Sequence, residues 1–198
     1  MQINSTNSGA SDVELIEIMS QLEVADGDAE LLRLLQEIGK EEFSLIGELI
    51  QTYCRADALC RGLIAMLREN RVGSPSDFAY TLNDADVLLH TVKEAEKTSL
   101  KIHTAGIISA VETITLHRVF RHTFSHWVVK KYVGGQYLVA FTKSKPDAEK
   151  RDDIALVDGQ AKLMAFPISN LMVELANIKE CCKVLSGIHY CLENFQAS

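Results

Sequence analysis

Side chains capable of acid–base and phosphate chemistry are concentrated in one short stretch of the sequence. Three of the six histidines, His117, His122 and His126, lie there together with Arg118 and Arg121. A neutral imidazole can remove a proton near pH 7, and a guanidinium can hold a phosphate and stabilise negative charge that develops on it. The combination predicts a site that binds, or acts on, a phosphate or another anion.

The stretch is part of a basic island in an acidic chain. No Asp or Glu occurs from Thr113 to Pro146, and the six Lys and Arg residues there give a formal charge of +6. The whole 198-residue chain has a net charge of −7, which leaves −13 for the remainder. The overall acidity argues against non-specific coating of nucleic acid, but it is compatible with a local phosphate site.

Helical periodicity gives the island two distinct faces. At 100° per residue, one arc of about 140° collects its polar members, namely Arg118, Arg121, His122, Ser125 and His126. The other side collects Val119, Phe120, Thr123, Phe124 and Trp127. In the preceding turns the same face of the helix is apolar and contains Ile107, Val111 and Ile114. We therefore expect a dry seam that opens into a cleft for an anion, with Arg118, Ser125, Lys130 and Lys131 binding the substrate.

Composition narrows the class of protein. With 47% hydrophobic and 24% charged residues, the chain is typical of a globular protein. No apolar run approaches the roughly 18 residues of a membrane span, and the polar N-terminus lacks the pattern of a signal peptide. Five cysteines, an odd number without framework spacing, favour reduced thiols and a cytoplasmic location.

The periodic pattern predicts a mainly α fold: an antiparallel helical bundle with a small β-meander inserted before the last helix. Residues 1–12 are expected to be a flexible tail and 13–198 a single domain, with the β excursion at about 136–166. The remaining expectations are a long helix over 41–70, a helix starting at Ser74-Pro75 and interrupted near Asn83, strands at 137–141, 154–157 and 162–166, and a mobile charged loop over 143–153. The helix with the polar island should lie next to the last helix.

The spacing Arg121-x4-His126, with His122 directly after the arginine, resembles the Arg-x4-6-His signature of the HEPN superfamily (higher eukaryotes and prokaryotes nucleotide-binding domains). The order of elements from about Glu41 to Phe195 is also similar, although the specific part is residues 121–126. The resemblance implies a metal-independent endoribonuclease without a cofactor that acts as a homodimer. Many relatives are toxins or defence effectors, some with an antitoxin partner. Arg121 and His126 would be the catalytic pair, and His122 a polar supporting residue.

Other interpretations stay open beside this one. The same basic residues would also serve a non-catalytic dimeric module that binds RNA, a nucleotide or a protein, or a solvated helix end that complements the helix dipole. Trp127 occupies a position where relatives often have a small residue, so it either narrows the cleft or packs in the core. The helical spacing of Cys182 and Cys191 around His189 favours core packing over zinc, and no metal is predicted.

Overall fold

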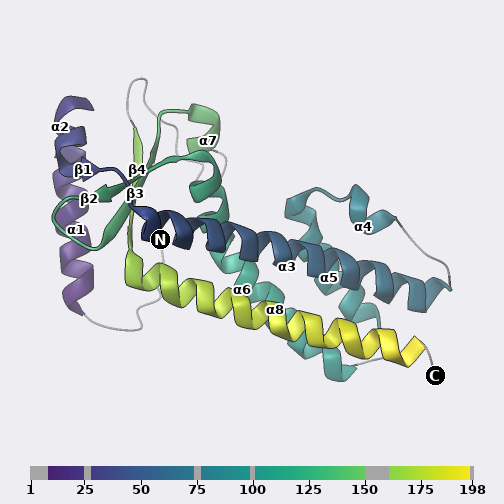
Figure 1. The fold of residues 1–198 in the computed structure, drawn as a ribbon. Coiled ribbons are helices and arrows are strands. Elements are labelled where there is room, and N and C mark those ends of the chain that lie inside the picture. Colours follow the sequence, from purple (N-terminus) through teal and green to yellow (C-terminus); the bar gives the residue numbers. More distant parts are fainter. Residues whose placement is uncertain (1–8, 25–27, 74–76, 99–100, 150–160, 197–198) are drawn as a thin grey trace. The chain divides into compact units, whose positions relative to one another are not determined.

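The computed structural model describes residues 9–24, 28–73, 77–98, 101–149 and 161–196 (Figure 1). Within these ranges the chain forms eight helices and one four-stranded antiparallel sheet, which confirms a mainly α fold with a small β element. The chain divides into two compact units. One comprises Met1–Leu45 and His122–Met172, and the other Ile46–Arg121 and Val173–Ser198. The expectation of a single domain stays a prediction.

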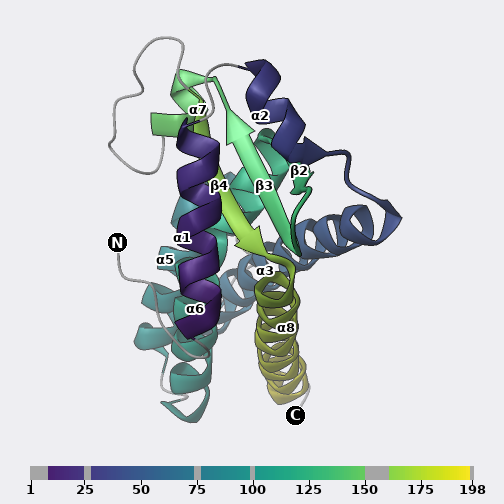
Figure 2. The same ribbon diagram turned by 90° about the vertical axis from the view of Figure 1, so that its left-hand side faces the viewer.

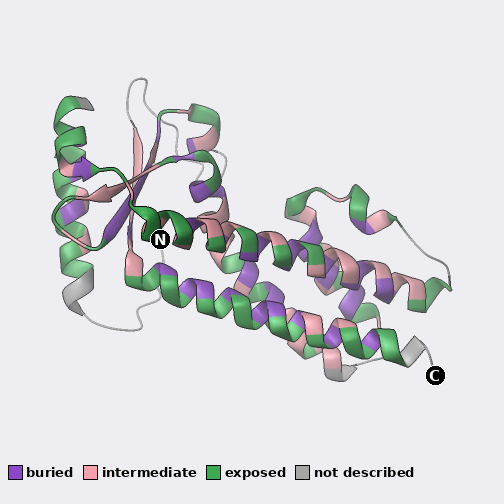
Figure 3. Ribbon diagram, viewed as in Figure 1, coloured by how far each residue is buried: buried purple, intermediate pink, exposed green. Residues whose placement is uncertain are grey.

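The second unit is a helical bundle. It contains most of α3 (Lys40–Val72), the short α4 (Phe78–Thr81), α5 (Asp84–Lys97), most of α6 (Lys101–His126) and most of α8 (Ile168–Gln196). α3 matches the predicted long helix over 41–70. It buries a stripe at spacings of three and four that includes Leu49, Tyr53, Cys60, Leu63, Ile64 and Leu67 (Figure 3). This stripe packs the helix into the bundle core.

Helix α8 lies against both α3 and α6 within this unit. The Cys182 thiol donates to the Thr52 carbonyl oxygen at 3.7 Å, and Lys179 pairs with Glu48 at 2.5 Å, which joins α8 to α3. Close to the start of α6, Gly106 brings the backbone near Ile188 of α8. The expected proximity of the island helix and the last helix is confirmed.

The break between α4 and α5 follows local capping chemistry. Asn83 has an extended backbone, and its side chain accepts a hydrogen bond from the Asp86 N–H, which makes it the N-cap of α5. Arg61 of α3 donates to the carbonyl oxygens of Ala79 and Leu82 at 2.6 and 3.0 Å, and so satisfies the end of α4. The predicted interruption near Asn83 is therefore correct. The predicted helix start at Ser74-Pro75 lies outside the described residues.

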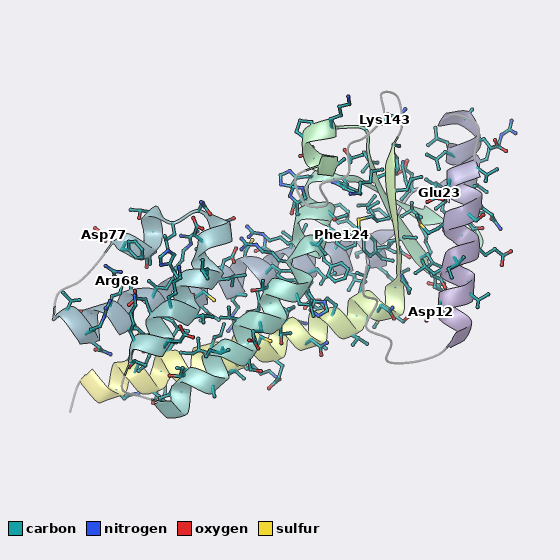
Figure 4. All side chains as sticks on the ribbon, turned by 180° about the vertical axis from the view of Figure 1, so that it is seen from behind. Asp12, Glu23, Arg68, Asp77, Phe124 and Lys143 are labelled. Carbon is teal, nitrogen blue, oxygen red and sulfur yellow. The ribbon has the colours of Figure 1, made fainter. Side chains whose placement is uncertain are left out.

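The first unit is built on a sheet with the order β1-β2-β3-β4. Its strands are β1 (Leu35–Gln36), β2 (Val128–Tyr132), β3 (Tyr137–Thr142) and β4 (Lys162–Pro167), and all neighbours are antiparallel. α1 (Gly9–Val24) covers one face of the sheet (Figure 2), with Ile18 and Leu22 in a core shared with Tyr137 and Val139. On α6, Phe124 lies among the side chains beside the strands (Figure 4), and its ring is 5.2 Å from that of Phe166.

Several boundaries differ from the sequence prediction. The sheet has two strands that were not predicted: β2 begins one residue after α6, and β1 follows directly on α2 (Asp28–Leu34). The sheet therefore extends well beyond the expected 136–166. Helix α7 (Lys145–Glu149) occupies part of the expected loop, and α1 begins at Gly9, inside the expected tail. The strand predicted at 154–157 lies outside the described residues.

Candidate phosphate-binding and acid–base site

Helix α6 carries the part of the island from His117 to His126 on its last three turns. Ile107, Val111 and Ile114 are all buried, so the predicted apolar part of the seam is confirmed. The boundary between the two compact units falls between Arg121 and His122. The surroundings of Arg118 and Arg121 therefore belong to the helical bundle, and those of His122 and His126 to the unit with the sheet.

Two arginines and two carboxylates form a cluster in the helical bundle. Arg121 donates through Nη1 to Oδ2 of Asp57 on α3, and the same nitrogen lies 3.3 Å from Oδ2 of Asp84 at the start of α5. Arg118 donates to the main-chain oxygen of Asp84, and its Nη2 lies 3.7 Å from Asp57 and 3.9 Å from Asp84. The bundle thus holds both guanidinium groups in place through acids from two other helices.

Asp57 is the most buried member of this cluster, with 8% of its surface exposed. Burial raises the pKa of its carboxyl, and the charges of Arg118 and Arg121 act in the opposite direction but do not cancel that effect. The charged form of Asp57 is therefore costly, and the two arginines are what make it tolerable.

Arg121 keeps binding capacity beyond these contacts. A guanidinium has five N–H donors, and the contacts of Arg121 with described residues all use Nη1. Its side chain is 25% exposed. Nε and Nη2 can therefore form the paired hydrogen bonds with which arginine recognises a phosphate.

A second polar cluster, on the same helix, was not predicted. Nδ1 of His117 lies 3.0 Å from Oε2 of Glu174 on α8, and the hydroxyl of Tyr53 on α3 lies 2.6 Å from Oε1 of the same carboxylate. No partner for His117 was predicted, and Tyr53, Asp57 and Glu174 were not among the predicted site residues. Their positions in the sequence carried a signal. Tyr53 lies in the apolar stripe of α3 and Asp57 lies one turn after it, so two polar side chains point toward the bundle core and need polar partners there.

The remaining predicted residues are found in the unit with the sheet. His122 is buried and its ring centroid is 4.7 Å from that of His126, whereas Ser125 and His126 are exposed. The expectation that His122 is part of an open polar face is therefore wrong, because only the other two are accessible. Trp127 is buried, so it packs in the core.

Lys130 and Lys131 lie on β2 and not on a helix. Lys130 pairs with Glu37, and Lys131 pairs with Glu42 at 2.6 Å. The hydrogen bond from Lys131 holds the pKa of Glu42 below its usual value. Both predicted substrate-binding lysines therefore have acidic partners within the unit that contains the sheet.

Within the described ranges, no set of three His, Cys, Asp or Glu side chains is arranged to hold a metal ion. No helix in the same ranges combines the length and apolar character needed to cross a membrane. Comparisons of the chain with models of known protein families, with curated proteins and with solved structures find no match.

Proposed function

We propose that this protein is a metal-independent endoribonuclease of HEPN type. The observation that carries the proposal is Arg121, which the bundle fixes through Asp57 and whose contacts with described residues use Nη1, five residues before the exposed His126 on the same helix. This is the spacing that resembles the Arg-x4-6-His signature.

The chemistry that we propose requires neither metal nor cofactor. Arg121, with Arg118 beside it, binds the phosphodiester and stabilises the charge that develops at phosphorus. His126 removes the proton of the ribose 2′-hydroxyl, whose oxygen then attacks the phosphorus. The products are a 2′,3′-cyclic phosphate and a free 5′-hydroxyl. His122, whose ring is tilted by 37° against that of His126 at a centroid distance of 4.7 Å, orients that imidazole in this proposal, and Ser125 is an accessible hydroxyl on the same turns.

The biological setting that we propose follows the resemblance. The protein would act in the cytoplasm as a homodimer, as a toxin or phage-defence effector that cleaves RNA, with an antitoxin or another protein as regulator. Expression of the wild type should then slow growth, and both Arg121→Ala and His126→Ala should relieve the effect. Harmless expression of the wild type without any partner would contradict the toxin role.

A second candidate function is a non-catalytic module that binds RNA, a nucleotide or a protein through the same residues. The ion pairs of Arg118 and Arg121 with Asp57 and Asp84 favour this candidate over catalysis, because they neutralise part of the positive charge that would stabilise the charge developing at phosphorus. In this case binding should weaken more for Arg121→Ala than for His126→Ala, since the guanidinium provides most of the attraction.

The decisive experiment is incubation of purified protein with a mixed RNA pool in EDTA. We expect cleavage by the wild type that leaves 2′,3′-cyclic phosphate ends, and its loss in Arg121→Ala and His126→Ala. His189→Ala is the matched control, because it removes a partly exposed histidine of α8 outside the motif. Cleavage that persists in His126→Ala would exclude His126 as the base, and the absence of any cleavage by the wild type would favour the binding module.

A further inference from the structure

The His117 imidazole is held on three sides in the helical bundle. Its Nδ1 faces Oε2 of Glu174 at 3.0 Å, and its ring stacks on Phe120 with centroids 5.9 Å apart and an interplanar angle of 11°. The Tyr53 hydroxyl lies 2.6 Å from Oε1 of Glu174 and 2.8 Å from the main-chain oxygen of His117. The orientation of the ring is therefore fixed by residues from α3, α6 and α8.

Burial determines which groups of this cluster donate a proton to a hydrogen bond and which accept one. Tyr53 is 1% exposed and Glu174 is 4% exposed. Burial raises the pKa of Tyr53, and the hydrogen bond to Glu174 raises it further, so the phenol stays protonated and donates. Burial also raises the pKa of Glu174, whereas the hydrogen bond from Tyr53 and the charge of His117 lower it. Glu174 accepts from Tyr53 through Oε1, and its Oε2 lies 3.0 Å from Nδ1 of His117, which leaves Nε2 of His117 as the nitrogen that can meet a ligand.

The exposure and position of His117 connect it to the phosphate-binding arginine. Its side chain is 31% exposed, although its partner Glu174 is buried. His117 and Arg121 are four residues apart on α6, so their Cβ atoms are neighbours on one helix face at about 6 Å. The two side chains therefore start about one helical turn apart on the same helix.

We propose that His117 is the catalytic acid that protonates the leaving 5′-oxygen of an RNA phosphodiester bound at Arg121. This inference rests on the ribonuclease function proposed above and adds a second proton-transfer residue to it. The P–O2′ bond forms as the 2′-hydroxyl gives up its proton to the base of the reaction. The P–O5′ bond breaks as Nε2–H gives its proton to the 5′-oxygen. The neutral imidazole then regains a proton from water.

A structural role is the alternative for the same geometry. The buried carboxylate of Glu174 needs polar partners, and it has the Tyr53 hydroxyl as a hydrogen-bond donor and Nδ1 of His117 at ion-pair distance. That role uses only Nδ1 of His117, whereas the catalytic role uses Nε2. Replacement by asparagine separates the two roles, because its amide can still donate in the place of Nδ1–H but cannot transfer a proton.

The test compares two RNA dinucleotides that differ in one atom of the leaving group. One has the natural 5′-oxygen, and the other has sulfur in its place, which departs as a thiolate without needing a proton. For His117→Asn we expect kcat on the natural substrate to fall about 10²- to 10⁴-fold. On the sulfur substrate we expect a loss of less than about tenfold, since general-acid catalysis is not needed there. Glu174→Gln, which removes only the charge behind the ring, should show a smaller loss with the same substrate dependence.

Each other outcome overturns a defined part of the reasoning. An equal loss on both substrates would show that His117 only positions other groups, provided that thermal unfolding shows a folded variant. Unchanged activity of His117→Asn on the natural substrate would remove His117 from the mechanism and leave the ribonuclease function standing. No cleavage of either substrate by the wild type would overturn the proposed function, and the role of His117 with it.

Discussion

Replacement of Asp57 should separate the effect of its charge from the effect of its hydrogen bonds. Oδ2 of Asp57 accepts from Nη1 of Arg121 and lies 3.7 Å from Nη2 of Arg118. At that separation, an effective dielectric constant of about 20 gives an attraction of about 4.5 kcal/mol for the longer pair alone. Removal of an ion from water costs several kcal/mol, and the raised pKa of Asp57 shows that this cost outweighs the attraction.

Two variants test this balance, one that keeps a hydrogen-bond acceptor at position 57 and one that removes it. Asp57→Asn keeps the shape and an acceptor but removes the buried charge, so we expect it to lower the free energy of unfolding by only about 1 kcal/mol. Asp57→Ala leaves two guanidinium groups without that acceptor and creates a space in the core, and we expect a loss of about 3 kcal/mol.

Urea unfolding followed by circular dichroism at 222 nm measures both differences. Asp77→Ala is the control, because Asp77 is an exposed acid of the same unit whose side chain makes no capping hydrogen bond, and it should change stability by less than about 0.5 kcal/mol. An Asp57→Asn variant as unstable as Asp57→Ala would refute the reasoning, because the charge and not the hydrogen bonding would then dominate.

Three further outcomes test other parts of the helical bundle. Burial raises the pKa of Glu94, but the hydrogen bond and charge of Lys97, together with the charges of Arg71 and Arg68, hold it below its ordinary value of 4.5. Thermal unfolding should therefore find the wild type more stable than Glu94→Gln at pH 7. This difference should disappear as the pH falls through the lowered pKa. Burial raises the pKa of Cys60 to about 12, whereas Cys191 is exposed, so mass spectrometry after brief alkylation of the native protein should find Cys191 modified and Cys60 intact. Asn83→Ala removes the N-cap of α5 and should cost about 1 kcal/mol in urea unfolding.

The long helices could be predicted because their signal is local and repeated. In α3 the apolar residues recur at helical spacing over 33 residues, and each turn adds evidence for the same assignment. The interruption at Asn83 was visible for a similar reason, since a capping side chain acts on the backbone of its own neighbours. Strand β3, with its run of β-branched and aromatic residues, also carries its own signal.

The sheet could be predicted only in part, because strands are completed by partners that are distant in sequence. β1 is two residues long and follows α2 without a break, and its pairing with β2 joins Leu35 to Tyr132. β2 is short, contains two lysines and starts one residue after the end of α6, so the helical pattern masks it. Its extent is defined by its partners on both sides, with Val128 opposite Phe141 of β3 and Tyr132 opposite Leu35 of β1.

The charge of the island could likewise be predicted only in part, because it depends on residues that are distant in sequence. A window without acids predicted an open cationic cleft, but a count along the chain cannot include carboxylates that arrive from other elements. Asp57 and Asp84 reach the arginines, and Glu174 reaches His117. Elsewhere Lys130 and Lys131 meet Glu37 and Glu42. The residue types of the site were predictable, and their protonation and hydrogen-bond partners were not.

The buried carboxylates argue for a site that is organised in advance. A bundle gains little net stability from buried ion pairs compared with apolar side chains of similar volume. Here Asp57 contacts Nη1 of Arg121, and Glu174 contacts Nδ1 of His117. In each case the other nitrogens of the side chain are left for a ligand. Groups held in this way need little reorganisation when charge develops or a proton moves. The cleavage assay in EDTA tests whether the site cuts RNA, and the leaving-group comparison tests separately whether His117 supplies the proton.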